Sequence, residues 1–317
     1  MTPNTPHISV LLQEVLEALM PEGRPPQRLI DGTLGAGGHT LALLERGTAH
    51  SLGLDLDPQA LGIARARLEA YIAQGRAHIA QASYLHLRDQ AQALAWDWAD
   101  AILLDLGVSS MQLDTPERGF AFRYEAPLDM RFAQDGRPSA ADLLNLWDEA
   151  ELSQIFWRYG EEKFSRQIAR AIVAHRPLQT TSQLADLVSA TVPKVRAKDR
   201  RPDSKSIHPA TRIFQALRIA VNDELQVLER TLPQALDMLC TGGRLAVISF
   251  HSLEDAIVKR IFKDASESFS APPGMASLGS KQAQVRLITR KPLEASEQEA
   301  QANPRARSAK LRVVEKL

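Results

Sequence analysis

Residues 28–55 read RLIDGTLGAGGHTLALLERGTAHSLGLD, and this stretch decides the fold. Apolar runs at 29–30 and 51–54 each end in an acid, Asp31 and Asp55, and a glycine-rich turn followed by a helical pattern separates them. A strand, a crossover helix and a second strand make a βαβ unit, from which parallel sheets are built. The segment therefore predicts an α/β protein in which both acids follow the carboxyl ends of strands.

The same alternation continues along the chain in both directions from these residues. Further strands are expected at 77–80, 99–104 and 244–250, and a last antiparallel ribbon at 285–289 with 310–314. The strand centres are nearly continuous apolar runs, as in parallel strands that are covered on both faces. We therefore expect a mostly parallel sheet with helices on either side and an antiparallel last strand.

The alternation stops after Asp105, which follows the strand at 99–104. A long segment without a clear period is followed by helical patterns only, up to about residue 192, with Ser139, Asp148 and Ser182 as expected N-caps. We therefore expect an inserted all-helical domain at 135–207, within a sheet domain made of residues 1–134 and 208–317.

Composition excludes several classes of protein. Among 317 residues, 38 Lys and Arg balance 38 Asp and Glu, and 44% are hydrophobic, which is typical of globular proteins. A single cysteine, Cys240, rules out a disulfide-stapled scaffold and a zinc cage built on several cysteines, and we expect no metal site. No apolar stretch of membrane-spanning length and no signal-like N-terminus are present, so we expect a cytoplasmic protein without membrane contact.

The glycine turn allows two classes of cofactor. A nicotinamide cofactor prefers G-x-G-x-x-G, but with Gly35 and Gly37 in the first two positions the third falls on Thr40. The acid that precedes the turn suits a cationic group better than a pyrophosphate. S-adenosylmethionine carries a cationic amino group, a sulfonium and a ribose diol, so the pattern favours it, with Asp31 toward the methionine end and Asp55 on the ribose.

Ordinary structural roles compete with these assignments. Asp57 precedes a proline at an expected helix start, so we predict that it is an N-cap. His39 fits a first-turn helix residue equally well on spacing alone. Tyr84, after the strand at 77–80, is either an aromatic face beside an adenine or a half-buried packing residue. Phe120 and Phe122 either stack on a base or pack in a core.

Nine motifs in a fixed order resemble the bacterial 16S rRNA (cytosine-N4)-methyltransferase family over nearly the whole chain. Each motif is weak alone, and their order is specific. They are HISVLLQEVLEAL (7–19), DGTLGAGGHT (31–40), DLGVSSMQLD (105–114), RGFAF (118–122), PLDMR (127–131), RYGEE (158–162), HPATRIFQALRIAVNDEL (208–225), GGRLAVISFHSLED (242–255) and NPRARSAKLRVVEK (303–316).

The resemblance implies a class I methyltransferase fold, Rossmann-like, with S-adenosylmethionine as methyl donor. It implies that the substrate is 16S rRNA, in an assembled or nearly assembled small ribosomal subunit, and that the inserted helical domain recognises it. The sequence leaves the oligomeric state open. The cofactor-binding residues that the resemblance implies are Gly37, Gly38, His39, Asp55, Tyr84, Asp105 and Gln112.

The catalytic residues are harder to assign. Cytosine N4 is a poor nucleophile, because its lone pair is delocalised, and an acceptor near its N–H helps the transfer. Many amino-methylating enzymes place an acidic or amide residue before Pro-Pro-aromatic, whereas Asp105 is followed by Leu-Gly-Val. Asp105 remains the first candidate for this acceptor. His251 is a second catalytic candidate, and its neighbours Ser252 and Asp255 have the spacing of a capping box.

Basic residues cluster in two segments despite the neutral total. Residues 194–218 hold eight basic and two acidic side chains, and 286–316 hold eight and four. Such patches suit phosphate contacts, although a solvated loop has the same composition. The expected RNA-binding residues are Lys194, Arg196, Lys198, Arg200, Arg201, Lys205 and Arg212.

Three other functions remain open. One is a methyltransferase of the same fold with another substrate, and a second is a non-catalytic ribosome assembly factor that keeps the cofactor pocket. A nicotinamide oxidoreductase is the third.

Overall fold

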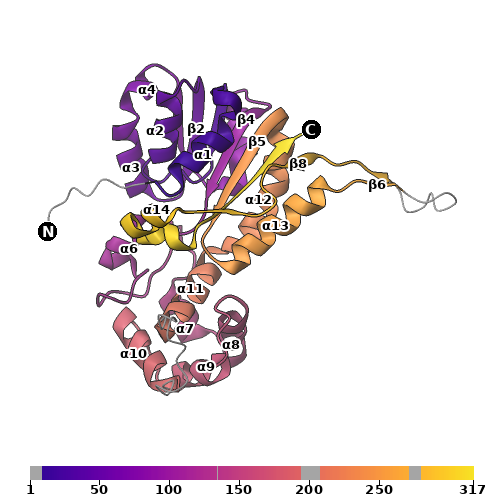
Figure 1. Ribbon diagram of the computed structural model, residues 1–317. Helices are drawn as coiled ribbons and strands as arrows, with labels where there is room; N and C mark the ends of the chain where they lie inside the picture. The colour runs from indigo at the N-terminus through magenta and orange to yellow at the C-terminus, as the bar shows by residue number, and fades with distance from the viewer. Residues whose placement is uncertain (1–8, 134, 194–207, 271–279) are drawn as a thin grey trace. The chain divides into compact units, whose positions relative to one another are not determined.

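The structure, a computed structural model, describes residues 9–133, 135–193, 208–270 and 280–317 (Figure 1). Its contacts divide the chain into two compact units. The sheet unit comprises Met1–Gly107 and Leu225–Leu317, and the helical unit comprises Val108–Glu224.

The sheet unit is built on one mixed sheet with the strand order β3-β2-β1-β4-β5-β10-β8. Strands β1 to β5 pair in parallel, and β10 runs antiparallel to β5 and β8. This is the strand order of the class I methyltransferase fold, and it confirms the expected sheet and its antiparallel last strand. The strands are β1 (Arg28–Asp31), β2 (His50–Asp55), β3 (Ala77–Gln81), β4 (Ala99–Asp105), β5 (Leu239–Ser249), β8 (Val285–Leu287) and β10 (Lys310–Lys316), with β9 (Leu293–Glu294) pairing β10.

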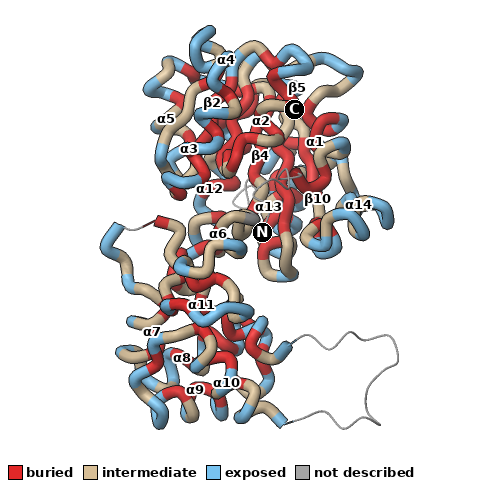
Figure 2. Tube along the Cα trace, turned by 90° about the vertical axis from the view of Figure 1, so that its left-hand side faces the viewer, coloured by how far each residue is buried: buried red, intermediate tan, exposed pale blue. Residues whose placement is uncertain are grey.

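Helices cover both faces of this sheet, and the buried residues lie between the layers (Figure 2). Because successive strand residues point to opposite faces, Ala101 and Leu103 of β4 pack under α1 and α2, while Ile102 and Leu104 face α5, α12 and α13. The helices are α1 (Leu12–Leu19), α2 (Gly38–Glu45), α3 (Pro58–Arg67), α4 (Glu69–Ala73), α5 (Leu87–Ala93), α12 (Glu224–Met238), α13 (Ser252–Ser266) and α14 (Glu297–Ala302). The short elements are η1 (Pro21–Gly23), η2 (Tyr84–His86), η6 (Pro304–Ser308) and the β6 (Phe269–Ser270)–β7 (Ser280–Lys281) ribbon.

Two stretches whose apolar spacing predicts one continuous helix each form two helices in the structure. The spacing of residues 58–73 predicts one long helix, but that helix breaks at Leu68, between α3 and α4. The spacing of residues 208–239 predicts one helix bent at Pro233, but the break lies at Asp223, whose φ of 54° is left-handed, and Pro233 lies inside α12. The expected bend at Pro233 is therefore replaced by a break at Asp223, since Asp tolerates the left-handed conformation better than most residues.

The helical unit packs its helices around its own apolar core. Ser139 and Asp148 cap α7 and α8 as expected, whereas Thr180, not Ser182, caps α10. The unit also includes segment 108–133 and α11, because Phe120, Leu128 and α11 residues such as Phe214 belong to its core. It is therefore larger than the expected 135–207. Its elements are α6 (Ser110–Asp114), η3 (Pro116–Arg118), α7 (Ala140–Leu146), α8 (Glu149–Arg158), α9 (Ser165–Ala174), α10 (Thr181–Thr191) and α11 (Pro209–Asn222).

Candidate functional site

Three acids lie at the carboxyl ends of neighbouring strands. Asp31 ends β1, Asp55 ends β2 and Asp105 ends β4, and β1 lies between the other two strands. Strands β2 and β3 lie on one side of β1, and β4 and β5 lie on the other. Open parallel sheets bind ligands at such a switch point, beyond the carboxyl ends of the strands. The structure thus brings together the three acids that the sequence singled out.

Two glycines of the turn that follows β1 disfavour a side chain, one because of its backbone conformation and the other because of its neighbour. Gly37 caps α2 with a φ of 78°, a left-handed conformation that L side chains rarely adopt. A Cβ on Gly38 would lie only 2.2 Å from the Ser9 Oγ atom. Gly37 and Gly38 therefore put backbone without side chains at the start of α2, where the first N–H groups of a helix lack partners within it.

Asp31 is buried beneath this turn. Its Oδ2 accepts a hydrogen bond from the Thr40 hydroxyl at 2.7 Å, and its Oδ1 accepts one from the Thr33 N–H at 3.2 Å. Burial raises the pKa of this carboxyl to about 6. Only 1% of Asp31 is exposed, so its role in this geometry is to stabilise the turn through these two hydrogen bonds.

Asp55 is half-buried and holds the turn from the side of β2. Its Oδ2 accepts the Gly35 N–H at 2.8 Å, and its Oδ1 accepts the Asp57 N–H at 2.8 Å. Burial raises the pKa of the Asp55 carboxyl. Asp57 itself caps α3 by accepting the Gln59 N–H at 3.0 Å, which confirms the capping prediction.

Asp105 is the acid whose hydrogen bonds are least satisfied. Its backbone N–H donates to the Thr33 hydroxyl at 2.6 Å, but its buried Oδ1 has no hydrogen-bond partner among the described residues. Burial, together with the negative charges of Asp31 and Glu254, raises the pKa of Asp105 to about 8. A carboxylate in such surroundings is stabilised by a positively charged neighbour.

His39 lies beside Asp105 and is buried. Its Nε2 is 2.9 Å from the Val10 carbonyl oxygen, and its Nδ1 is 3.8 Å from Oδ2 of Asp105. Because a carbonyl oxygen only accepts, the proton of this bond belongs to Nε2. The Nδ1 atom is thereby presented to the Asp105 carboxyl.

His251 follows β5 and caps α13. Its Nδ1 accepts the Glu254 N–H at 3.4 Å, while the Glu254 Oε2 accepts the Phe250 N–H at 2.8 Å and the His251 N–H at 3.3 Å. The His251 Nε2 lies 3.1 Å from the Glu254 Oε1, in an ion-pair contact whose geometry is not that of a hydrogen bond. Both ring nitrogens of His251 therefore face Glu254.

The capping box of α13 lies one residue before the one that the sequence suggested. His251 and Glu254 form it, and not Ser252 and Asp255. Asp255 instead accepts two hydrogen bonds from Arg312 of β10, at 2.7 and 3.1 Å. Glu254 was missed from the sequence because His-x-x-Glu and Ser-x-x-Asp overlap in this segment, and the serine pattern is the commoner cap.

Tyr84 and Gln112 lie in different units. Tyr84 begins η2 after β3 and is half-buried against the core of the sheet unit. Gln112 lies in the helical unit, where its side chain accepts the Ser109 N–H at 3.0 Å as part of the capping box of α6.

The two loop phenylalanines pack within the helical unit. Phe120 is buried and stacks on Phe132, with ring centroids 5.6 Å apart. Phe122 packs edge-on against Phe214 at 5.0 Å. Their contacts match core packing, one of the two roles that the sequence left open.

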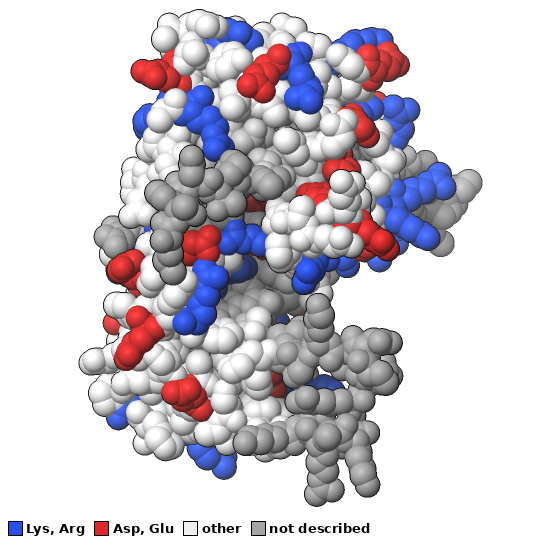
Figure 3. All heavy atoms as spheres, turned by 60° about the vertical axis from the view of Figure 1, so that its left-hand side comes forward, with Lys and Arg blue, Asp and Glu red and all other residues white. Residues whose placement is uncertain are grey.

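Most expected RNA-binding residues lie outside the described residues. These are Lys194, Arg196, Lys198, Arg200, Arg201 and Lys205. Arg212 is described: it lies on α11, its side chain is 48% exposed, and it is 3.7 Å from Glu162. The face drawn in Figure 3 mixes Lys and Arg with Asp and Glu, in keeping with the neutral total.

Metal-binding and membrane-spanning features are both absent from the described parts of the chain. No group of three or more His, Cys, Asp or Glu side chains there has the arrangement of a metal site. No helix in those same parts is long and apolar enough to cross a membrane.

Comparison with known proteins gives matches over nearly the whole chain. The model of the MraW methylase family matches residues 4–317. The ribosomal RNA small subunit methyltransferase H of Heliobacterium mobile is 48% identical over 318 residues, covering 98% of this chain and 99% of that protein. The protein of the same name from Trichlorobacter lovleyi is 47% identical over 317 residues, covering 98% of each. The chain therefore belongs to the MraW methylase family.

Proposed function

We propose that this protein transfers a methyl group from S-adenosylmethionine to N4 of a cytidine in 16S rRNA, within the small ribosomal subunit of the cytoplasm. The observation that carries the proposal is the Asp105 carboxyl at the switch point of the sheet. It lies beside a bare glycine turn and has a buried oxygen without a hydrogen-bond partner among the described residues. Full-length similarity to proteins named as small-subunit rRNA methyltransferases supports the choice of substrate.

The residues at this edge fit S-adenosylmethionine better than a dinucleotide. The negative charges of Asp31 and Glu254 add to the effect of burial in raising the pKa of Asp105. Three acids this close together favour a cation over a pyrophosphate. We assign the cationic part of the cofactor to Asp105. Asp31 supports that contact from beneath the turn, where it binds Thr33 and Thr40.

Other residues would hold the remaining parts of the cofactor. Asp55 has lone pairs left for the ribose hydroxyls, because each carboxylate oxygen accepts more than one hydrogen bond. Gly37, Gly38 and His39 offer the bare start of α2, and Tyr84 offers an aromatic face after β3. Gln112, in the helical unit, belongs to the set by family resemblance alone.

The bound cofactor supplies an electrophilic methyl group on a sulfonium sulfur. The transfer forms a carbon–nitrogen bond at N4 and breaks the carbon–sulfur bond, and N4 gives up one proton. Asp105 is the proton acceptor that we propose, because its Oδ1 has no hydrogen-bond donor among the described residues. The positive charge that we assign to Asp105 favours its ionised form, and the ionised carboxylate is the form that can accept a proton from N4.

His251 has a supporting role in this proposal. Because its Nδ1 accepts a backbone N–H, the ring proton lies on Nε2, and no ring nitrogen is left to accept a proton from the base. It holds the start of α13, and it keeps Glu254 near Asp105. His251 is therefore a positioning residue in the proposed reaction.

Phosphate contacts would come from the basic side chains of residues 194–212. Neutralised phosphates release counterions, so a cluster of Lys and Arg strengthens RNA binding in a salt-dependent way. The helical unit, which carries these residues, is the part that we assign to recognition of the ribosomal substrate.

A transfer assay tests the substrate class. Labelled S-adenosylmethionine is offered with small ribosomal subunits, naked 16S rRNA, duplex DNA or free cytidine. We expect incorporation into the subunit only. Transfer to DNA or to free nucleoside would give the protein another substrate, and subunit binding without transfer would make it an assembly factor. A rise in melting temperature with NAD but not with S-adenosylmethionine would support an oxidoreductase.

A further inference from the structure

A single peptide unit near the N-terminus connects the cofactor site to the C-terminal helix α14. The carbonyl of Val10 accepts the Nε2–H of His39 at 2.9 Å. The N–H of Leu11, which belongs to the same planar peptide, donates to Oε1 of Glu299 at 2.7 Å. A peptide unit is rigid, and its N–H and C=O point in opposite directions. Glu299 therefore binds its N–H, while His39 binds its C=O from the other side.

The backbone beside this peptide is strained. Leu11 is fully buried and has a φ of 52°, in the left-handed region that residues with a Cβ atom rarely adopt. Such conformations persist where the surroundings hold them, and they gather at functional sites. The charge-assisted bond to Glu299 is the contact that holds the Leu11 N–H in this direction.

The segment that contains Leu11 also packs closely against the glycine-rich turn. Ser9 is buried, and its Oγ occupies the space that a Cβ of Gly38 would need. Three consecutive residues, Ser9 to Leu11, thus contact Gly38, His39 and Glu299 in turn. All of these residues belong to the sheet unit.

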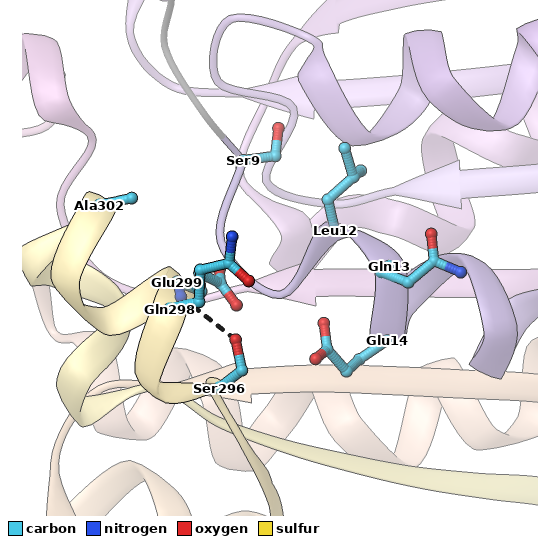
Figure 4. Close-up of a pocket in the computed structure, with 8 residues that line it drawn as sticks. All are labelled: Ser9, Leu12, Gln13, Glu14, Ser296, Gln298, Glu299 and Ala302. Carbon is cyan, nitrogen blue, oxygen red and sulfur yellow. Dashed lines mark hydrogen bonds between the residues drawn. The ribbon is translucent and has the colours of Figure 1, made fainter.

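Local contacts of α14 position Glu299 for its hydrogen bond with the Leu11 N–H. Ser296 caps the helix by accepting the Glu299 N–H at 3.2 Å, and Figure 4 shows both residues beside the start of α1. With Ser9, Leu12 and Glu14, among others, they line a pocket of about 320 Å³. Glu299 is half-buried there, while its neighbour Glu297 is exposed.

We infer that Glu299 is a positioning residue of the cofactor site. Glu299 accepts the Leu11 N–H and so keeps the Val10 carbonyl directed toward His39. That carbonyl keeps the ring proton of His39 on Nε2, and the Nδ1 atom then faces Asp105. If the peptide turned over, the Leu11 N–H would face the Nε2–H of His39, and two donors would oppose each other. This inference rests on the proposed function, because it assigns the cofactor to the site that His39 and Asp105 form.

Binding of S-adenosylmethionine by the full-length protein tests the inference. We expect Glu299→Ala to raise the dissociation constant by about five- to tenfold, a usual size for coupling between sites. Glu299→Gln keeps an acceptor oxygen and should restore most of the affinity. At saturating cofactor the transfer rate should stay near that of the wild type, so that KM changes and kcat does not.

A matched variant separates this role from a loss of helix charge. Glu297→Ala removes an exposed acid from the same first turn of α14, so it should leave cofactor binding unchanged. If Glu299→Ala does not fold, Glu299→Asp shortens the side chain by one methylene and should weaken binding in the same direction.

The NMR shifts of the His39 ring nitrogens give a second readout. In the wild type they should report a proton on Nε2, and in Glu299→Ala a mixture of tautomers.

Two results would overturn this role or its basis. A Glu299→Ala protein that melts earlier but binds S-adenosylmethionine as the wild type does would make Glu299 merely structural. A folded wild-type protein that does not bind S-adenosylmethionine would instead remove the proposed function, and this inference with it.

Discussion

At the scale of single residues, Asp105 makes the stability of the folded protein depend on pH. Its pKa of about 8 lies far above that of an unfolded aspartate, so the folded protein holds a proton that the unfolded chain has lost. Stability conferred by this group is therefore present at low pH and is lost as the pH rises toward 8. Asp31 contributes in the same sense, but only up to about pH 6.

Replacement of Asp105 by asparagine should remove this pH dependence. Between pH 6 and 8 the free energy of unfolding of the wild type should fall by up to about 1.4 kcal/mol per pH unit, and that of Asp105→Asn should stay nearly level. Urea unfolding at pH 6, 7 and 8 measures both proteins. Equal slopes for the two proteins would contradict the raised pKa.

Gly38 offers a second test at this scale, because Ser9 fills the space beside it. We expect Gly38→Ala to destabilise the protein by about 1–3 kcal/mol, as overpacking does, and to weaken cofactor binding. A Cβ added to Gly62, inside α3, would meet nothing within 4 Å, so Gly62→Ala should stabilise by about 0.5–1 kcal/mol. Thermal melts of both variants provide the comparison, and a stable Gly38→Ala would contradict the close approach of Ser9.

At the scale of elements, apolar runs predicted the strands well, because parallel strands that are buried on both faces must be apolar. The acids at 31, 55 and 105 were found for the same reason, since each ends such a run. Helix ends were harder to predict. The breaks at Leu68 and Asp223 do not interrupt the apolar spacing, and backbone conformation, which the spacing does not report, produces them.

The start of α13 provides a test of such an end. His251 caps the helix, and loss of an N-cap typically costs about 0.5–2 kcal/mol. We therefore expect His251→Ala to lower the free energy of unfolding by that amount, with a smaller loss for Ser252→Ala. Denaturant midpoints of the two variants measure the difference. A larger loss of stability in Ser252→Ala than in His251→Ala would identify Ser252 as the N-cap instead.

At the scale of the whole molecule, the sequence predicted an inserted helical domain but placed its borders differently. Segment 108–133 and α11 belong to the helical unit, because their apolar residues complete its core. Core membership depends on contacts between distant residues, which one sequence does not display. Glu254 and Glu299 were missed for related reasons, since Glu299 bonds to a residue far along the chain and Glu254 lies in an ambiguous motif.

The basic segment makes a prediction that concerns the whole complex. Replacing Lys194, Arg196, Lys198, Arg200, Arg201 and Lys205 with alanine should weaken binding to the small subunit. It should also flatten the dependence of log affinity on log salt, because fewer counterions are released. Binding titrations at several salt concentrations measure the slope, and cofactor affinity serves as the control. An unchanged slope would remove these residues from the RNA interface.

The central claim is methyl transfer to N4 of a cytidine in 16S rRNA, with Asp105 as the proton acceptor. The most direct measurement is mass spectrometry of the nucleosides of small subunits taken from cells that lack this gene, after incubation with the protein and labelled S-adenosylmethionine. We predict N4-methylcytidine at one site, formed about 100-fold or more slowly by Asp105→Asn, with Glu297→Ala as active as the wild type. A label on another atom or another nucleoside, or full activity of Asp105→Asn, would contradict the claim.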